Sequence, residues 1–136
     1  LLAEQNGKKV IITHTPTWII GVDATNGKQI WKFNFSSVNA DLKGGKNYIH
    51  TPIYRDGFVF AANGYGQTSA KIKVNTDGSE PTLVWKNPEI NPHVGGMVLI
   101  GNYIFRYTHD NNTMGRYISV DWTKCKTMWL TEWNNK

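Results

Sequence analysis

The four histidines of the chain are the side chains best suited to metal binding or proton transfer, and they lie far apart in the sequence. They are His14, His50, His93 and His109. A zinc site that can be recognised from sequence has closely spaced ligands, such as two histidines with one or three residues between them. No pair here has that spacing. The sequence therefore predicts no metal site and no catalytic residue.

Motifs of nucleotide binding and hydrolysis are also missing from the sequence. It contains no Gly-x-Ser-x-Gly, no Gly-Lys-Ser/Thr phosphate loop and no Gly-x-Gly-x-x-Gly. The glycine-rich segment 63–66 follows a predicted strand but opens no helix that could bind a phosphate. Segment 75–78 resembles the start of a calcium loop but lacks the distal glutamate, so we predict a plain turn there.

Two connections between predicted strands hold the residues with the best claim to a ligand site. They span residues 47–52 and 91–96, and each places a histidine beside small or proline residues, so that backbone and imidazole can approach a ligand closely. Segment 109–112 follows a predicted strand and is expected to reach the same rim. The candidate ligand-binding residues are His50, His93, Gly95, Gly96 and His109. The alternative is ordinary turn chemistry, in which Asn, Pro and Gly only set backbone angles.

The elements that position these loops can be inferred from three tryptophans. Trp31, Trp85 and Trp129 each close a related stretch: VDATNGKQIW, VNTDGSEPTLVW and VDWTKCKTMW. Their spacing is typical of β-propeller blades. A repeat of this size cannot bury its own apolar face and must stack on its neighbours. We expect repeats at about residues 1–40, 41–90 and 91–136.

A β-hairpin is predicted ahead of each of these stretches. Asn6-Gly7, Asp56-Gly57 and Gly101-Asn102 separate short apolar runs and supply the positive φ angles that two-residue hairpins need. Each repeat continues with a strand, a turn and the tryptophan-bearing strand. With one further outer or inner strand, this makes a four-stranded antiparallel blade. No stretch sustains helical spacing, so the predicted fold class is all-β with almost no helix.

Strand alternation predicts the core. Three pairs occupy matching places two residues apart, and so lie on one face of their strand: Ile20 and Val22, Ile72 and Val74, Ile118 and Val120. The three tryptophans are expected to pack against these pairs between adjacent blades. The alternative is that the tryptophans form a stacking platform for a flat ligand.

Charge and cysteine content exclude several classes of protein. The net charge is +5, but the basic residues are scattered and do not cluster as in a nucleic-acid-binding face. No apolar run is long enough to span a membrane as a helix. The single cysteine, Cys125, excludes an internal disulfide.

The repeats also resemble a known family. GVDATNGKQIWKF (21–33) is similar to the repeat of PQQ-like β-propellers, roughly hydrophobic-Ala-hydrophobic-Asp-x-x-Thr-Gly-x-x-x-Trp. Segments 51–66, 93–105 and 119–129 resemble a secreted bacterial branch described as polyvinyl-alcohol dehydrogenase-like. That branch carries His-His-Gly-Gly where this chain has His93-Val94-Gly95-Gly96. It also has a turn glycine, matched by Gly27 and Gly78, where the third repeat has Cys125.

The resemblance implies one segment of a propeller ring of seven or eight blades, located outside the cytoplasm. The expected partners are the remaining blades of a longer protein or a second copy of the chain, together with a peptide, glycan or protein ligand. We expect a binding or scaffold module that needs no cofactor. The alternative is part of a quinoprotein alcohol dehydrogenase, which would use PQQ with calcium and would need Asp, Asn and Glu ligands at one mouth of the channel.

Overall fold

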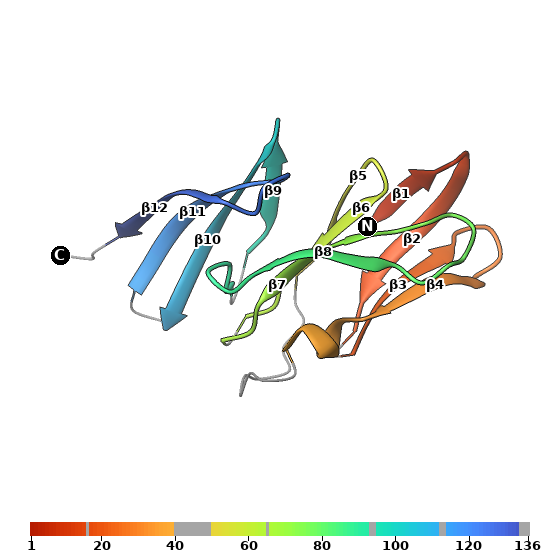
Figure 1. The fold of residues 1–136 in the computed structure, drawn as a ribbon, viewed down its shortest axis with the longest axis horizontal. Helices are drawn as coiled ribbons and strands as arrows, with labels where there is room; N and C mark the ends of the chain where they lie inside the picture. The colour runs from red at the N-terminus through yellow and green to blue at the C-terminus, as the bar shows by residue number, and fades with distance from the viewer. Residues whose placement is uncertain (16, 40–49, 65, 93–94, 112–113, 134–136) are drawn as a thin grey trace.

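The chain is all-β and folds into three four-stranded antiparallel sheets in chain order (Figure 1). The computed structural model describes residues 1–136 except 16, 40–49, 65, 93–94, 112–113 and 134–136. The first sheet contains β1 (Leu2–Gln5), β2 (Lys8–His14), β3 (Trp18–Asp23) and β4 (Gln29–Asn34). The second contains β5 (Ile53–Arg55), β6 (Phe58–Ala61), β7 (Ser69–Lys73) and β8 (Thr82–Asn87). The third contains β9 (Met97–Ile100), β10 (Tyr103–Asn111), β11 (Met114–Asp121) and β12 (Thr127–Trp133).

The prediction of almost no helix is confirmed. Within the described ranges the helical structure is limited to the 3-10 helix η1 (Phe35–Asn39), which follows β4. No helix among the described residues has the length and apolar character needed to cross a membrane.

Each sheet is a simple meander whose first two strands form the predicted hairpin. Asn6 and Gly7 have φ angles of 48° and 74°, and Asp56 and Gly57 have 50° and 79°. Positive φ at both central residues gives a turn whose twist matches the flanking strands. The hairpin already supplies two of the four strands, so the further outer or inner strand that we expected is not needed.

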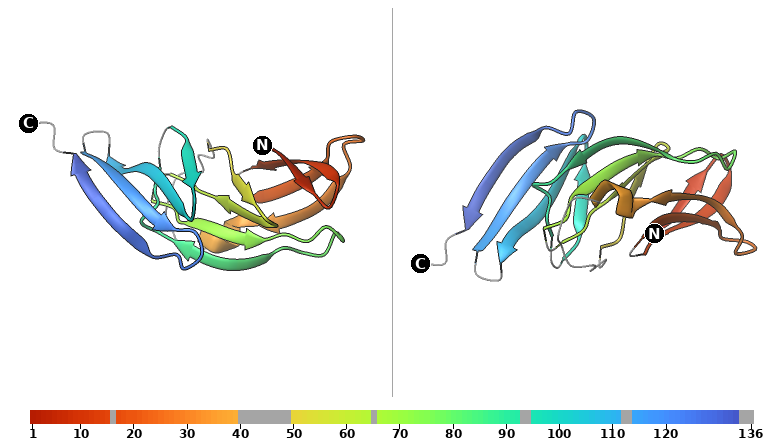
Figure 2. Two further views of the ribbon diagram at one scale, coloured as in Figure 1. Left: turned by 90° about the horizontal axis from the view of Figure 1, so that it is seen from above. Right: turned by 60° about the horizontal axis from the view of Figure 1, so that its bottom comes forward.

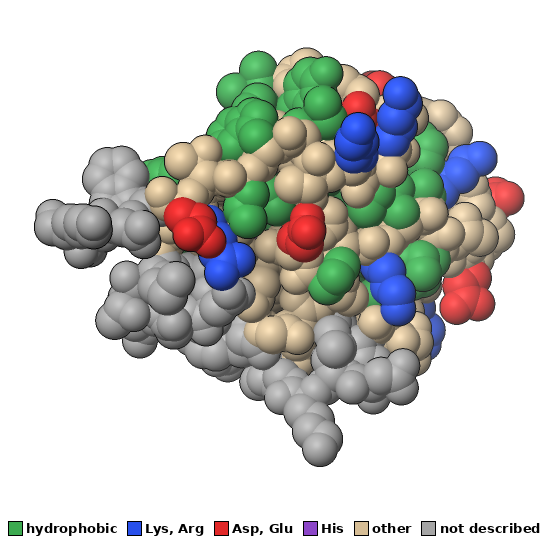
Figure 3. Space-filling view, turned by 60° about the vertical axis from the view of Figure 1, so that its left-hand side comes forward, with side chains coloured by type: hydrophobic (Ala, Val, Ile, Leu, Met, Phe, Trp, Pro, Cys, Tyr) green, Lys and Arg blue, Asp and Glu red, His purple; other side chains and the backbone are tan. Residues whose placement is uncertain are grey.

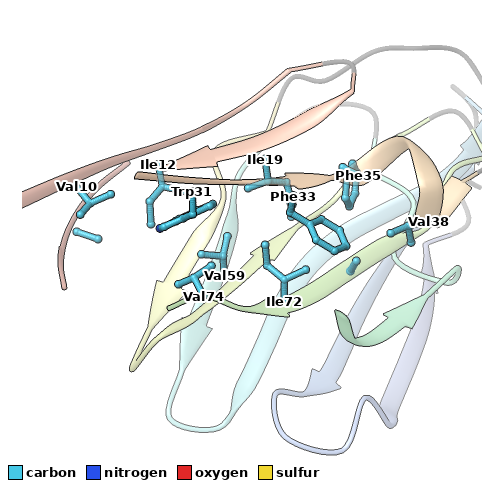
Figure 4. Close-up of a cluster of buried hydrophobic side chains, with 13 residues drawn as sticks. Val10, Ile12, Ile19, Trp31, Phe33, Phe35, Val38, Val59, Ile72 and Val74 are labelled. Carbon is cyan, nitrogen blue, oxygen red and sulfur yellow. The ribbon is translucent and has the colours of Figure 1, made fainter. Parts of the chain in front are cut away.

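The three sheets lie side by side, with the second sheet between the other two (Figure 2). One buried cluster joins the first sheet to the second. There, Trp31 lies among Ile12, Val59 and Val74 (Figure 4). Another cluster joins the second sheet to the third and includes Phe60, Ile104, Ile118 and Trp122, with Trp85 packed against it. Each sheet alone has one layer of side chains per face, so its stability depends on its neighbour.

The three tryptophans occupy matching positions in their sheets. Trp31 pairs with Gly21, Trp85 with Lys71 and Trp129 with Ser119. In every case the strand register shifts directly after the residue that pairs with the tryptophan. Because residues that pair across a ladder share a face, the tryptophans mark the same face of each sheet. This confirms that they are equivalent.

Two of the three apolar pairs pack as predicted. Ile72 and Val74 are buried in the cluster that contains Trp31, and Ile118 and Val120 are buried in the cluster against which Trp85 packs. Trp31 and Trp85 therefore each contact the next sheet along the chain. No sheet among the described residues packs on Trp129, which is 46% exposed.

The prediction for Ile20 and Val22 was wrong. Both are only partly buried, and the core of the first sheet is formed by their neighbours Ile19 and Gly21 on the opposite face. Ile20 and Val22 lie on the face directed away from the second sheet, and no sheet among the described residues covers that face.

Candidate functional site

His50 lies just before β5 and fastens this segment to the connection between the second and third sheets. Its Nδ1 lies 2.9 Å from the carbonyl oxygen of Gly95, and its Nε2 lies 3.1 Å from that of Pro92. The imidazole is 6% exposed. Residues 50 and 95 are far apart in sequence, so this contact brings together two of the predicted site residues.

Arg106, on β10, completes this arrangement. Its Nη2 lies 3.3 Å from each ring nitrogen of His50 and 3.3 Å from the carbonyl oxygen of Gly95. A neutral imidazole has one donor and one acceptor nitrogen, so one ring nitrogen of His50 donates to a carbonyl oxygen and the other accepts from Arg106. Burial lowers the pKa of Arg106 to about 10, so the guanidinium stays charged at neutral pH. We call His50, Gly95 and Arg106 the His50 clasp.

Asn91 holds the other end of the same connection. Its backbone N–H donates to the hydroxyl of Thr108 at 3.0 Å, and its side-chain oxygen accepts from the N–H of Gly66 at 3.0 Å. The connection after the second sheet is thus bonded to β10 at both Asn91 and Gly95. Asn91 and Gly95 are therefore each held in place against β10.

His14, the last residue of β2, lies near the clasp on the side of the first sheet. It helps to line a hollow of about 210 Å³ together with Ile12, His50 and Pro52. Burial, and secondly the proximity of His50, lower the pKa of His14 to about 4. At neutral pH its ring is therefore uncharged. The ring also lies against Phe35, with 5.7 Å between the ring centroids.

A larger groove of about 760 Å³ runs between the first strands of the second and third sheets. β5 and β9 lie beside each other, and each is the edge strand of its sheet. The lining is formed by these two strands, the residues that lead into them, and Leu1; it comprises Leu1, residues 51–55 and residues 95–99. Gly95 and Gly96 form the part of the lining next to the clasp. Both lack side chains, so a ligand can approach their backbone closely.

The structure brings together three of the five predicted site residues. His50 and Gly95 meet in the clasp, and Gly96 lines the groove beside them. His93 lies outside the described residues, as do residues 47–49 of segment 47–52. His109 belongs to β10 and not to a loop after a strand, because that strand continues to Asn111.

Sequence reasoning missed Arg106 and left His14 unassigned. The signal for Arg106 was present: it alternates with Ile104 in the run YIFRYT, which places a charged residue on the buried face of a strand. A charged side chain at such a position needs partners within the protein.

A polar hollow of about 490 Å³ lies where the turns after β1, β5 and β7 come together. Glu4, Asp56 and Asp77 contribute carboxylates to its lining. Among the described residues, no group of three His, Cys, Asp or Glu side chains is placed to hold a metal ion. In segment 75–78, Asp77 Oδ1 accepts a hydrogen bond from the N–H of Ser79 at 2.9 Å, as in an ordinary turn.

Chemically, the clasp is suited to holding backbone in place. The nitrogens of His50 are directed at two carbonyl oxygens and a guanidinium, which is an arrangement that orients loops. The groove is suited to binding, since it combines two strand edges with two glycines. In comparisons with known proteins, no protein-family model and no curated protein matches this chain.

Proposed function

We propose that the three sheets are consecutive blades of a β-propeller, and that the chain is a binding or scaffold module with no catalysis of its own. The observation that supports this best is the groove between β5 and β9, which the His50 clasp borders. In a propeller the first strand of each blade faces the central channel, so this groove would open into that channel. A location outside the cytoplasm is part of the proposal and rests on the sequence resemblance.

The ligand that fits this groove is an extended peptide. Edge strands present backbone N–H and C=O groups that an added strand can pair with, and side-chain pockets then give specificity. Ile53, Met97 and Leu99 are partly buried apolar residues in or beside the groove that could receive side chains of the peptide. A glycan would make less use of two parallel rows of backbone groups.

The quinoprotein alternative needs a calcium ion held beside the quinone by several oxygen ligands. The carboxylates of the described residues do not form such a set. The His50 clasp carries the positive charge of Arg106, which would repel calcium. We expect that PQQ, calcium and an alcohol added to the purified chain will give no reduction of a redox dye.

Gly96 offers a direct test of the peptide groove. A Cβ at Gly96 would meet no atom within 4 Å, and the residue does not have a positive φ. Gly96→Trp should therefore fold normally while filling the groove. Peptides would first be selected from a displayed random library on the wild-type protein. Their affinity for Gly96→Trp is then expected to fall about tenfold or more, which is a loss of at least 1.4 kcal/mol.

Thr82→Trp is the matched control, because Thr82 is an exposed residue of β8 and does not line the groove. It should leave peptide affinity unchanged. If the selected peptides bind Gly96→Trp as well as wild type, or if no peptide is enriched, the proposed peptide groove is wrong.

A further inference from the structure

Among the described residues, no other sheet covers the face of the third sheet that carries Trp129, although the same face of the other two sheets is packed against a neighbour. Strand register places Trp129, Phe105 and Val98 in one row across this face, with Tyr103 and Ile100 in the next row. Trp129 and Phe105 are in contact, with 6.2 Å between their ring centroids, and Phe105 contacts Tyr103 at 6.4 Å. We call this the Trp129 face. Figure 3 brings the left-hand side of Figure 1, where the third sheet lies, forward, and hydrophobic side chains gather on part of the surface seen there.

The exposure of the Trp129 face departs from the pattern within the chain. Trp31, at the same ladder position in the first sheet, is 1% exposed because the second sheet covers it. Trp129 is 46% exposed, and Val98 and Ile100 are 53% and 61% exposed. A contiguous apolar and aromatic patch of this kind marks an interaction surface.

The first sheet carries the surface that would fit on it. Ile11 pairs with Val22 in the first sheet, just as Val59 pairs with Ile72 in the second and Ile104 with Val120 in the third. These ladder positions receive the preceding tryptophan: Val59 and Ile72 share a cluster with Trp31. We call the surface formed by Leu2, Ile11, Ile20 and Val22 the Ile11 face.

The Ile11 face is also uncovered. Val59 and Ile104 are 0% and 1% exposed, whereas Ile11 at the equivalent position is 44% exposed and its partner Leu2 is 61% exposed. The chain therefore exposes one tryptophan face and one aliphatic face. Faces of these two kinds already pack on each other between its first and second sheets and between its second and third sheets.

We propose that a second copy of this chain binds head to tail, with its Ile11 face on the Trp129 face of the first copy. The contact would repeat the packing between the first and second sheets and between the second and third. The two faces differ, so the association is heterologous: it forms a closed ring if the rotation between copies closes and a longer chain of copies if it does not. This inference depends on strand register and exposure, and not on the peptide groove.

The first experiment measures the mass of the purified chain by sedimentation velocity over a range of concentrations. The wild type is expected to form dimers or larger assemblies. Trp129→Lys should weaken the association roughly 30-fold or more, which is the effect expected of a tryptophan at the centre of an interface. Leu130→Lys is the control, because Leu130 is the adjacent residue, is 41% exposed and pairs with Ile118 on the opposite face of the sheet. It should associate like the wild type.

The second experiment tests the head-to-tail arrangement. Ile11→Lys should also prevent self-association. An equimolar mixture of Trp129→Lys and Ile11→Lys retains one intact Trp129 face and one intact Ile11 face, so it should form heterodimers that grow no further. Both variants change exposed side chains, and circular dichroism and urea unfolding would establish that they fold.

Two results would overturn the proposal. One is a wild-type chain that remains monomeric at all concentrations. The other is an Ile11→Lys variant that associates like the wild type, because association would then occur between two Trp129 faces or at another surface.

Discussion

The indole of Trp31 lies directly over Gly21, its partner across β3 and β4. A Cβ added to Gly21 would overlap ring atoms of Trp31, so the glycine is what lets the ring lie flat against its own sheet while its other side contacts the second sheet. The equivalent partners are Lys71 and Ser119 in the other sheets.

Gly21→Ala should destabilise the protein by about 1–3 kcal/mol, the usual cost of forcing extra volume into a packed core. The measurement is the free energy of unfolding from urea titration. Gly96→Ala is the control, because an added Cβ there meets nothing within 4 Å; its effect should stay within about 0.5 kcal/mol. Equal effects of the two substitutions would contradict the packing argument.

Cys125 occupies the turn position that Gly27 occupies in the first sheet. The N–H of Cys125 donates to the carbonyl oxygen of Asp121 at 3.0 Å, as the N–H of Gly27 donates to that of Asp23 at 2.9 Å. The φ angles are 58° and 75°. A residue with a side chain is strained in this region, so Cys125→Gly should stabilise the protein by about 1 kcal/mol.

The reciprocal substitution, Gly27→Cys, should lower the free energy of unfolding by a similar amount. An added Cβ at Gly27 meets no neighbour within 4 Å, so backbone strain alone would be responsible. If Cys125→Gly destabilises the protein, the weak contact of Cys125 Sγ with the carbonyl oxygen of Lys86 must outweigh the strain.

Stability should fall as the pH is lowered from about 6.5 to about 4, because of His14. Burial, with a smaller contribution from His50, lowers the pKa of folded His14 to about 4, whereas the unfolded residue titrates near 6.5. In this window the unfolded chain binds a proton that the folded chain does not, so the stabilisation is complete above pH 6.5 and is lost on acidification. The full loss is about 3 kcal/mol.

Urea unfolding at a series of pH values would measure this loss. His14→Phe removes the titrating group while keeping a ring against Phe35, so its stability should vary much less between pH 6.5 and 4. The carboxyl groups of Asp23, Asp77 and Asp121, whose pKa values are lowered by hydrogen bonds to neighbouring turn residues, would affect stability only at lower pH. An unchanged slope in His14→Phe would contradict this assignment.

The sequence predicted the fold well where the information was local. Asn-Gly and Asp-Gly pairs specify hairpins through their own backbone angles, and the tryptophans mark one strand in each repeat. The interfaces were harder to predict, because the face a sheet buries depends on what lies beside it. Ile20 and Val22 have the same alternation as Ile118 and Val120, but no sheet covers them.

Sequence alignment alone also could not predict which residues occupy equivalent positions in the three sheets. The sequence aligned Val74 with Val22 and Val120, whereas the strand ladders equate Ile72 with them. The turn that follows β7 is longer than the matching turns of the other sheets, which displaces the alignment by two residues. The candidate site was only partly predictable for a similar reason: the contact of His50 with Arg106 spans 56 residues and follows from the stacking of whole sheets.

The His50 clasp should behave as one coupled unit. His50→Leu removes the ring nitrogens that face the carbonyl oxygens of Gly95 and Pro92, and it should cost about 1–3 kcal/mol because buried polar groups lose their partner. Arg106→Leu should cost a similar amount.

If His50 and Arg106 act on each other directly, the double variant should be less destabilised than the sum of the single variants, with a coupling of about 0.5–3 kcal/mol. Urea unfolding of the four proteins gives this cycle, and limited proteolysis would show whether residues 91–96 become more accessible. Strict additivity would mean that the two side chains hold the connection independently.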